Sequence, residues 1–431
     1  MKIGFITLGC KVNIYESNAL MNMFSKEGFE VCEPSSECDA FIINTCSVTN
    51  QADAKSRKMI QKAKKYNPNA VVVAMGCYIQ TSKEASNIDG VDVFIGNGNK
   101  LEAIQLVKEA LIERKNKECH IIDIMNETNY EQLEATIFDH SRAFVKIQDG
   151  CNNFCSYCII PYARGPIRCK KADDVIAELN RITTMGYEEV VLAGIHTGKY
   201  NDNGVKLSDL IERIINEVTL LKRLRLSSIE INEIDDKLLE IMKNSKIMAD
   251  HLHLPLQSGC DKILGLMNRR YDTAYFLDKI NKIREVRPNI AITTDVIVGF
   301  PTETDEDYLI TKEFIKTVNF STLHVFPYSK RSGTKAYDMK QVNDTVKKQR
   351  ALDLIELSNK LKQEYEEKFI NSEVEVIFEE IVDDKYMVGH SSNFIKIYTE
   401  INDEYLKKSA NVIIKEIKNE KIFGEIVKKS K

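Results

Sequence analysis

The sequence predicts an α/β protein in three parts: an amino-terminal parallel-sheet domain, a central (β/α)6-type partial barrel and a small carboxyl-terminal antiparallel β-barrel. Apolar strands alternate with helical segments through most of the chain, and short alternating strands replace them from Ser372 onward. The length of 431 residues fits about three domains. With 43% hydrophobic and 29% charged residues, the composition is that of a globular protein, which excludes a disordered or fibrous chain.

Residues 1–110 are predicted to form the first domain. Strands are expected at 2–8, 39–43, 70–75 and 91–95, and helices at 15–27, 53–66 and near Thr81. Strands that alternate with helices at this spacing build a parallel sheet through right-handed crossovers. A polar, acid-rich connector is expected at 111–139.

Residues 140–370 are predicted to form the partial barrel. Candidate strands are 143–148, 189–193, 223–231, 251–256, 291–298 and 322–327, with helical segments such as 173–185 and 273–286 between them. Six βα units indicate a barrel or part of one. After a helix at 343–369, residues 371–431 have the short alternating strands of a small antiparallel barrel.

The formal net charge of −4 means that a polyanionic partner must bind to local basic patches. Residues 407–431 carry eight lysines against three glutamates, which makes them a candidate nucleic-acid surface or simply a solvated face. The chain has no run of 18 apolar residues and starts directly with a strand pattern. We therefore expect no membrane segment and a cytoplasmic location.

Eleven cysteines in a chain expected in a reducing compartment point to metal binding or catalysis. Cys151, Cys155 and Cys158 form a C-x3-C-x2-C triad just after the first strand of the predicted barrel. Three thiolates on one loop can each bind one iron of a [4Fe-4S] cluster and leave the fourth iron open for chemistry. A structural zinc site would need a fourth ligand, which the neighbouring sequence does not supply.

A second set of cysteines, Cys10, Cys46 and Cys77, is scattered in the sequence. Each stands at or just beyond the end of a predicted strand of the first domain, and the carboxyl ends of parallel strands share one edge. We favour a second three-cysteine cluster site here, over the alternative of three small buried thiols. The other five cysteines show no comparable placement and are interpreted as structural or incidental: Cys32, Cys38, Cys119, Cys169 and Cys260.

The cysteine loop, with the aromatic Tyr157 before its last cysteine, resembles that of radical S-adenosylmethionine (radical SAM) enzymes. Further motifs extend the resemblance over the whole chain: TLGCKVN at 7–13, NTCSVT at 44–49, GCNNFCSYCIIPYARG at 150–165, HLPLQSG at 253–259 and VGFPTET at 298–304. In this order they are similar to the methylthiotransferase family. TLGCKVN resembles the branch that acts on N6-threonylcarbamoyladenosine at position 37 of tRNA. Cys169 and Cys260 stand where many relatives have serine.

The resemblance implies two [4Fe-4S] clusters, an auxiliary one on Cys10, Cys46 and Cys77 and a radical SAM one on the other triad. It also implies that S-adenosylmethionine supplies both a methyl group and a 5′-deoxyadenosyl radical, and that a methylthio group is transferred to C2 of the adenine. No catalytic residue beyond the clusters is expected. Residues expected to contact S-adenosylmethionine are Tyr157, Gly194, Glu230 and Gln257. His196 is interpreted as a structural histidine.

The partners implied by the resemblance are the anticodon loop of tRNA, bound partly by a TRAM-like carboxyl-terminal barrel, and a reducing electron donor such as a flavodoxin or ferredoxin. The sulfur donor stays unassigned. Candidate phosphate contacts are Arg164, Arg168, Lys170 and Lys171 after the cluster loop, and a basic helix with Lys55, Arg57, Lys58, Lys62, Lys64 and Lys65, for which a solvated face is preferred. Alternatives are methylthiolation of isopentenyladenosine-37 or of a ribosomal-protein aspartate, and a non-catalytic iron–sulfur RNA-binding or electron-transfer module.

Overall fold

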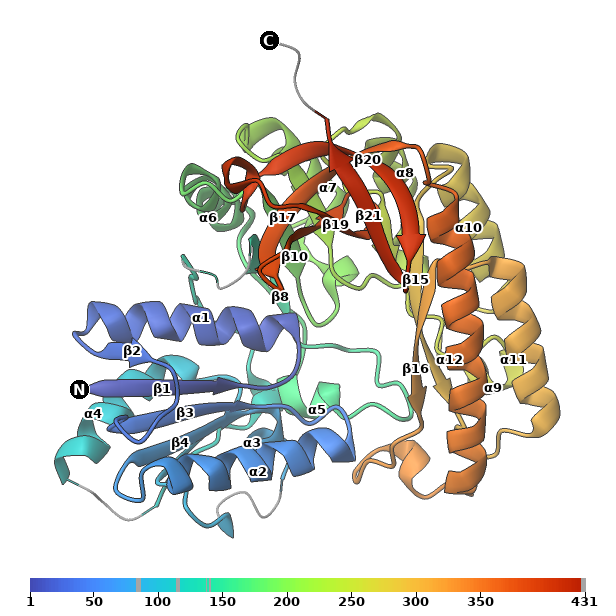
Figure 1. The fold of residues 1–431 in the computed structure, drawn as a ribbon. Helices are drawn as coiled ribbons and strands as arrows, with labels where there is room; N and C mark the ends of the chain where they lie inside the picture. The colour runs from blue at the N-terminus through green and yellow to red at the C-terminus, as the bar shows by residue number, and fades with distance from the viewer. Residues whose placement is uncertain (83–86, 114–116, 137, 139–140, 428–431) are drawn as a thin grey trace.

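The computed structural model describes residues 1–82, 87–113, 117–136, 138 and 141–427 (Figure 1). The predicted α/β fold is confirmed, with an amino-terminal parallel sheet, a central partial barrel and a carboxyl-terminal ring of strands. Within these residues no helix combines the length and the apolar character needed to span a membrane.

The amino-terminal domain is a parallel sheet in the order β2-β1-β3-β4-β5-β6. Its strands are β1 (Lys2–Thr7), β2 (Glu30–Cys32), β3 (Ala40–Thr45), β4 (Val71–Gly76), β5 (Val93–Ile95) and β6 (Glu118–His120). Its helices are α1 (Lys11–Lys26), α2 (Asn50–Tyr66), α3 (Cys77–Thr81) and α4 (Ala103–Glu113). The sequence analysis missed β2 and β6, because each is a three-residue edge strand whose apolar pattern is too short to detect.

The central domain contains two groups of parallel strands, β7-β10-β13 and β14-β15-β16. Short bridges join the groups, pairing Leu224 with Met248 and Ser228 with His253. The strands are β7 (Arg142–Lys146), β10 (Glu189–Ala193), β13 (Arg223–Leu226), β14 (His251–His253), β15 (Ala291–Val298) and β16 (Thr322–Pro327). The described strands therefore form a curved wall that leaves β7 and β16 as its two edges.

The remaining elements of the central domain connect and cover this wall. Its helices are α5 (Ile160–Arg164), α6 (Ala172–Thr184), α7 (Leu207–Glu217), α8 (Asp236–Asn244), α9 (Asp261–Leu266), α10 (Thr273–Val286), α11 (Asp305–Val318) and α12 (Asp344–Glu367). Two small antiparallel pairs are β8 (Gln148–Asp149) with β9 (Arg168–Cys169), and β11 (Asn201–Asp202) with β12 (Val205–Lys206).

The carboxyl-terminal strands close into a barrel in the order β17-β18-β19-β21-β20. They are β17 (Glu373–Val382), β18 (Tyr386–Ser391), β19 (Lys396–Glu400), β20 (Ser409–Lys418) and β21 (Lys421–Ile426). The expectation of a wholly antiparallel barrel was wrong in one respect, since β19 and β21 pair in parallel. A closed ring of these five strands cannot alternate direction all the way round, so one neighbouring pair must run parallel.

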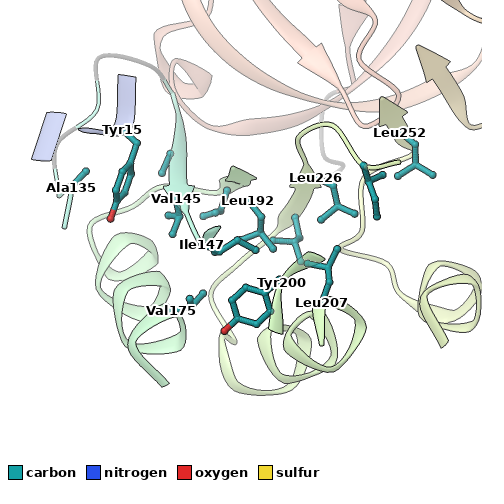
Figure 2. Packing of buried hydrophobic residues seen from close by; sticks show 14 of the residues in the cluster. Tyr15, Ala135, Val145, Ile147, Val175, Leu192, Tyr200, Leu207, Leu226 and Leu252 are labelled. Carbon is teal, nitrogen blue, oxygen red and sulfur yellow. The ribbon is translucent and has the colours of Figure 1, made fainter. Parts of the chain in front are cut away.

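One hydrophobic core runs through both α/β domains (Figure 2). Tyr15 of α1 lies in the same cluster as Val145 of β7 and Leu192 of β10. Its hydroxyl donates to the carboxylate of Glu178 on α6, at 2.9 Å. Because separating the domains would expose this shared apolar core to water, the amino-terminal sheet is held in a fixed position beside β7.

Candidate functional site

The loop that carries Cys151, Cys155 and Cys158 lies between β8 and α5, at the carboxyl ends of the barrel strands. Its backbone is fixed at both ends. The Cys151 N–H donates to the Gly165 carbonyl at 3.0 Å, and the Cys158 N–H donates to the Cys155 carbonyl at 2.9 Å. Gly150, just before the loop, has a φ of 75°, and a Cβ there would lie 1.9 Å from the Pro166 carbonyl oxygen. The turn therefore requires glycine.

Side-chain nitrogens face two of the loop sulfurs. An Nη of Arg269 lies 3.4 Å from Cys155 Sγ, and Nδ1 of His196 lies 3.5 Å from Cys151 Sγ. The buried His196 also forms an ion pair with Glu233. Burial alone would lower the pKa of His196, but the contacts with Cys151 and Glu233 raise it to about 9. Donors that face cysteine sulfurs are typical of iron–sulfur sites, where they tune the cluster.

The structure brings the second cysteine set together at one edge of the amino-terminal sheet. Cys10 precedes α1, Cys46 follows β3, and Cys77 begins α3 directly after β4. A Cβ on Gly9 would lie 3.0 Å from Cys46 Sγ. Burial raises the pKa of Cys46 to about 11, and the nearby thiols of Cys77 and Cys10 add to that rise. Three thiols thus converge without any bond between them.

The spacing of these sulfurs allows a test between zinc and a larger cluster. A tetrahedral zinc ion with Zn–S distances of about 2.3 Å holds its sulfurs about 3.8 Å apart. Within the part of the chain that the structure describes, no three cysteine sulfurs lie within 4.8 Å of one another. Within these residues, neither cysteine set holds its sulfurs as close together as the ligands of a single zinc ion.

Four of the five cysteines that were interpreted as structural or incidental have ordinary contacts, and the fifth, Cys119 of β6, is exposed. Cys32 and Cys38 lie on one side of the amino-terminal sheet with their sulfurs 3.4 Å apart. Cys169 accepts a hydrogen bond from the Asn201 N–H at 3.3 Å, and Cys260 lies 3.6 Å from the Asp307 carboxylate.

A buried ion network joins the two α/β domains beside the second cysteine set. Glu16 of α1 contacts Lys100 at 3.0 Å, Lys146 at 2.9 Å and Arg164 at 2.8 Å. Asp149 contacts Arg164 at 3.1 Å and Lys146 at 3.0 Å. Burial would raise the pKa of Glu16, yet Arg164, Lys100 and Lys146 hold it well below its usual value. Cations outnumber carboxylates here, which favours negative charge on the neighbouring thiols.

This network corrects one expectation about phosphate binding. Arg164, Arg168 and Lys170 are all buried, and Lys170 forms an ion pair with Glu178 at 2.6 Å. A side chain without exposed surface cannot contact a tRNA phosphate, so these three residues have a structural role. Lys171 alone of that group is exposed.

The amino-terminal domain contacts both edges of the barrel wall. On one side α1 packs against β7. On the other side Arg331, in the segment after β16, binds Asp53 at 2.7 Å and Ser47 at 2.7 Å. The Asn50 N–H also donates to Ser329 at 3.0 Å. The domain therefore contacts both edges of the partial barrel, beside β7 and beside the segment after β16.

A cavity of about 200 Å³ lies at this junction. Tyr157 and Cys158 line it from the cluster loop, Gln257 lines it from the segment after β14, and Val48 and Thr49 line it from the amino-terminal domain. Gln257 has a φ of 66°, an unusual conformation for a residue other than glycine, and such strain clusters at functional sites.

The other two predicted contacts of S-adenosylmethionine lie at the carboxyl ends of neighbouring strands. A Cβ on Gly194 would lie 2.9 Å from Oε1 of Gln148, so a larger residue would require the Gln148 side chain to move. Glu230 is held by Arg269 at 3.0 Å and by Asn153 of the cluster loop at 2.9 Å. The sequence analysis missed Arg269, because no motif or spacing marks a residue that meets the loop only in the folded chain.

Comparison with known proteins agrees with this arrangement. The profile of the "Uncharacterized protein family UPF0004" matches residues 2–96, and that of the radical SAM superfamily matches residues 145–315. Over 96% of the chain, the sequence is 40% identical to the threonylcarbamoyladenosine tRNA methylthiotransferase MtaB of Bacillus subtilis, covering 93% of that protein. The chain belongs to the methylthiotransferase family. A tRNA-2-methylthio-N6-dimethylallyladenosine synthase of a Thermoanaerobacter species is 36% identical over 98% of this chain and 92% of its own length.

Solved structures support the fold of this methylthiotransferase. The radical S-adenosylmethionine methyltransferase TsrM of Kitasatospora setae aligns with a TM-score of 0.58, at 13% identity over 78% of this chain and 76% of that one. At such low identity the likeness concerns the fold alone. Membership of the radical SAM superfamily implies one [4Fe-4S] cluster and S-adenosylmethionine as cofactors of the methylthiotransferase.

Proposed function

We propose that this methylthiotransferase adds a methylthio group to C2 of N6-threonylcarbamoyladenosine at position 37 of tRNA, with two [4Fe-4S] clusters and S-adenosylmethionine as cofactors. The observation that carries the proposal is the pair of three-thiol sets on two domains that face one junction. When bound, the clusters and S-adenosylmethionine supply the radical, the methyl group and the site at which sulfur is held. The relatives named for threonylcarbamoyladenosine support the choice of nucleoside.

The chain's own residues hold and shield this chemistry. Cys151, Cys155 and Cys158 would bind one cluster, and Arg269 would donate to its sulfur ligand, as it does to Cys155 here. Tyr157, Gly194, Glu230 and Gln257 are proposed to contact S-adenosylmethionine. Closure of the barrel by the amino-terminal domain would keep water away from a reactive radical.

The second cluster is proposed on Cys10, Cys46 and Cys77. Asn97 supports this site, because its side-chain amide donates to Cys77 Sγ at 3.4 Å and to the Ala163 carbonyl of α5 at 2.7 Å. The same amide thus touches the amino-terminal cysteine and the helix that follows the radical SAM loop. The excess buried positive charge around Arg164 would offset the negative charge of thiolate ligands.

The tRNA partner is expected to bind exposed lysines at local patches. Those on the carboxyl-terminal barrel include Lys407, Lys408, Lys415 and Lys418. The candidates Lys428, Lys429 and Lys431 lie outside the described residues. We keep a reducing donor such as a flavodoxin or ferredoxin in the proposal, because cleavage of S-adenosylmethionine needs one electron.

Cysteine variants of the reconstituted enzyme test the proposal. Cys155→Ala should abolish formation of 5′-deoxyadenosine, because the radical SAM cluster loses a ligand. Cys46→Ala should still form 5′-deoxyadenosine but no 2-methylthio nucleoside, measured by mass spectrometry of digested tRNA. Iron content should fall from about eight to about four per chain when all three cysteines of either set are replaced. Methylthio transfer by Cys46→Ala at the wild-type rate would overturn the assignment of the second cluster.

A further inference from the structure

Three side chains outside the cluster sites meet on the inner face of the barrel wall. His253 of β14 lies 3.3 Å from the Asp295 carboxylate of β15, and His324 of β16 lies 3.4 Å from the same carboxylate. The two imidazole rings stack with their centroids 5.4 Å apart. Burial would raise the pKa of Asp295, but the two histidines hold it well below its usual value. The group is therefore an ionised carboxylate between two imidazoles.

This group opens toward the cavity beside the radical SAM loop. Asp295 lines that cavity together with Cys158 and Phe326. His324 and Phe326 are two residues apart on β16, so their side chains lie on the same face of the strand. Of the His324 side chain 55% is exposed, and of Phe326 44%. An exposed aromatic ring beside an exposed imidazole forms a surface on which a nucleobase can stack.

The orientation of the histidines leaves one edge available to a ligand. His253 is fixed through Nδ1, which lies 2.9 Å from the Thr293 hydroxyl, and its Nε2 faces Asp295. His324 faces Asp295 through Nδ1, so its Nε2 edge projects from the half-exposed ring. A carboxylate and an oriented imidazole can together pair with a ligand that has both hydrogen-bond donors and acceptors.

We propose that His253, Asp295 and His324 form the subsite that binds the polar N6 substituent of the target adenosine, with Phe326 stacking on the base. This inference rests on the proposed function and names the part of the site that selects the nucleoside. A threonylcarbamoyl group offers N–H donors, a hydroxyl and a carboxylate. A dimethylallyl group, named in the 36% identical relative, is apolar and offers no hydrogen-bond donor or acceptor to the Nε2 edge of His324. Sites built for polar groups reject analogues that lack them.

The test compares binding and turnover by wild type and His324→Phe, which keeps an aromatic ring but removes both nitrogens. Substrates are anticodon stem-loops with adenosine-37 unmodified, threonylcarbamoylated or dimethylallylated. We expect wild type to bind the threonylcarbamoylated stem-loop at least about tenfold more tightly than the unmodified one. His324→Phe should lose that preference while binding the unmodified stem-loop as wild type does. The matched control is His120→Phe, since His120 also lies beside carboxylates, 3.3 Å from Glu118, but on the amino-terminal sheet.

Two readouts separate this proposal from the proposed function. Iron content and tRNA-independent formation of 5′-deoxyadenosine should stay at wild-type levels in His324→Phe, because the residue contacts neither cysteine set. If wild type prefers the threonylcarbamoylated stem-loop but makes no 2-methylthio product, the subsite stands and the proposed function fails. If wild type methylthiolates it while His324→Phe keeps its preference within about twofold, the subsite is wrong and the function stands.

Discussion

Glu16→Gln should destabilise the protein far more than loss of a single charge at its surface. Glu16 is wholly buried and has three cations within 3.0 Å: Lys100, Lys146 and Arg164. After the change, Asp149 still pairs with Lys146 and Arg164, but Lys100 loses its ion pair and keeps a hydrogen bond to the neutral Asn97 at 2.8 Å. Removing one partner of a buried ion pair costs about 3–5 kcal/mol.

A loss of that size should be visible in thermal unfolding of the reconstituted protein. For domains of about 150–250 residues, each kcal/mol lowers Tm by about 2–4 °C, so Tm should fall by about 6–20 °C. Glu27→Gln is the control, since Glu27 pairs with Lys108 at 2.6 Å in the same domain, but the two side chains lie at the surface and are 48% and 36% exposed. Such exposed pairs contribute about 0–1 kcal/mol. A fall in Tm for Glu16→Gln no larger than that of the control would refute the reasoning.

The same change has a predicted pH dependence. The pKa of Glu16 is lower in the folded protein than in the unfolded chain, where it is about 4.3. The contribution of Glu16 to the free energy of unfolding is therefore fully present above that pH and is lost as the pH falls further. The difference in Tm between wild type and Glu16→Gln should therefore stay constant from about pH 8 to pH 5. Adding Lys100→Met should restore part of the stability, because it removes the cation left unpaired.

Three further changes test the packing around the site. Gly150→Ala should lower iron content by about four per chain, because its Cβ would lie 1.9 Å from the Pro166 carbonyl; full iron content would contradict this. Arg331→Ala removes the 2.7 Å ion pair with Asp53 and should speed limited proteolysis of the amino-terminal domain relative to wild type. Phe394→Ala should lower the free energy of unfolding by about 1–2 kcal/mol in calorimetry, since the half-exposed ring packs on arginines of β7 and β13; no change would mean that the barrel contact is weak.

The strand pattern alone predicts that the scattered cysteines share one edge of the sheet, for a physical reason. Cys46 and Cys77 follow β3 and β4 directly, and parallel strands place their carboxyl ends at one edge whatever the rest of the chain does. The radical SAM loop could be recognised from the sequence as well, because its three cysteines lie within eight residues. The spacing of residues in a loop and the direction of parallel strands can both be inferred from the sequence, before any tertiary contact is known.

Contacts between domains could not be predicted in this way. Arg164 follows the apolar run 159–163, but the sequence does not show which carboxylates would meet an arginine at this position. It is buried because Glu16 and Asp149 meet it from two different domains. The same holds for Asp295, whose neighbours His253 and His324 come from other strands. Ionic groups are hidden at such places only because each has a partner distant in sequence.

Helix α5 follows the radical SAM loop directly in sequence and also contacts the amino-terminal domain. It begins two residues after Cys158 and ends at Arg164, so it is covalently tied to the radical SAM loop. Its Ala163 carbonyl accepts from Asn97, which also donates to Cys77, and Arg164 donates to Asn13 of α1 at 2.6 Å. A displacement of the amino-terminal domain would have to break these buried bonds together with the Glu16 network. A short helix thus helps to fix the relative placement of the two cysteine sets, because Ala163 and Arg164 both bind residues of the amino-terminal domain. This explains why its arginine is buried rather than available to tRNA.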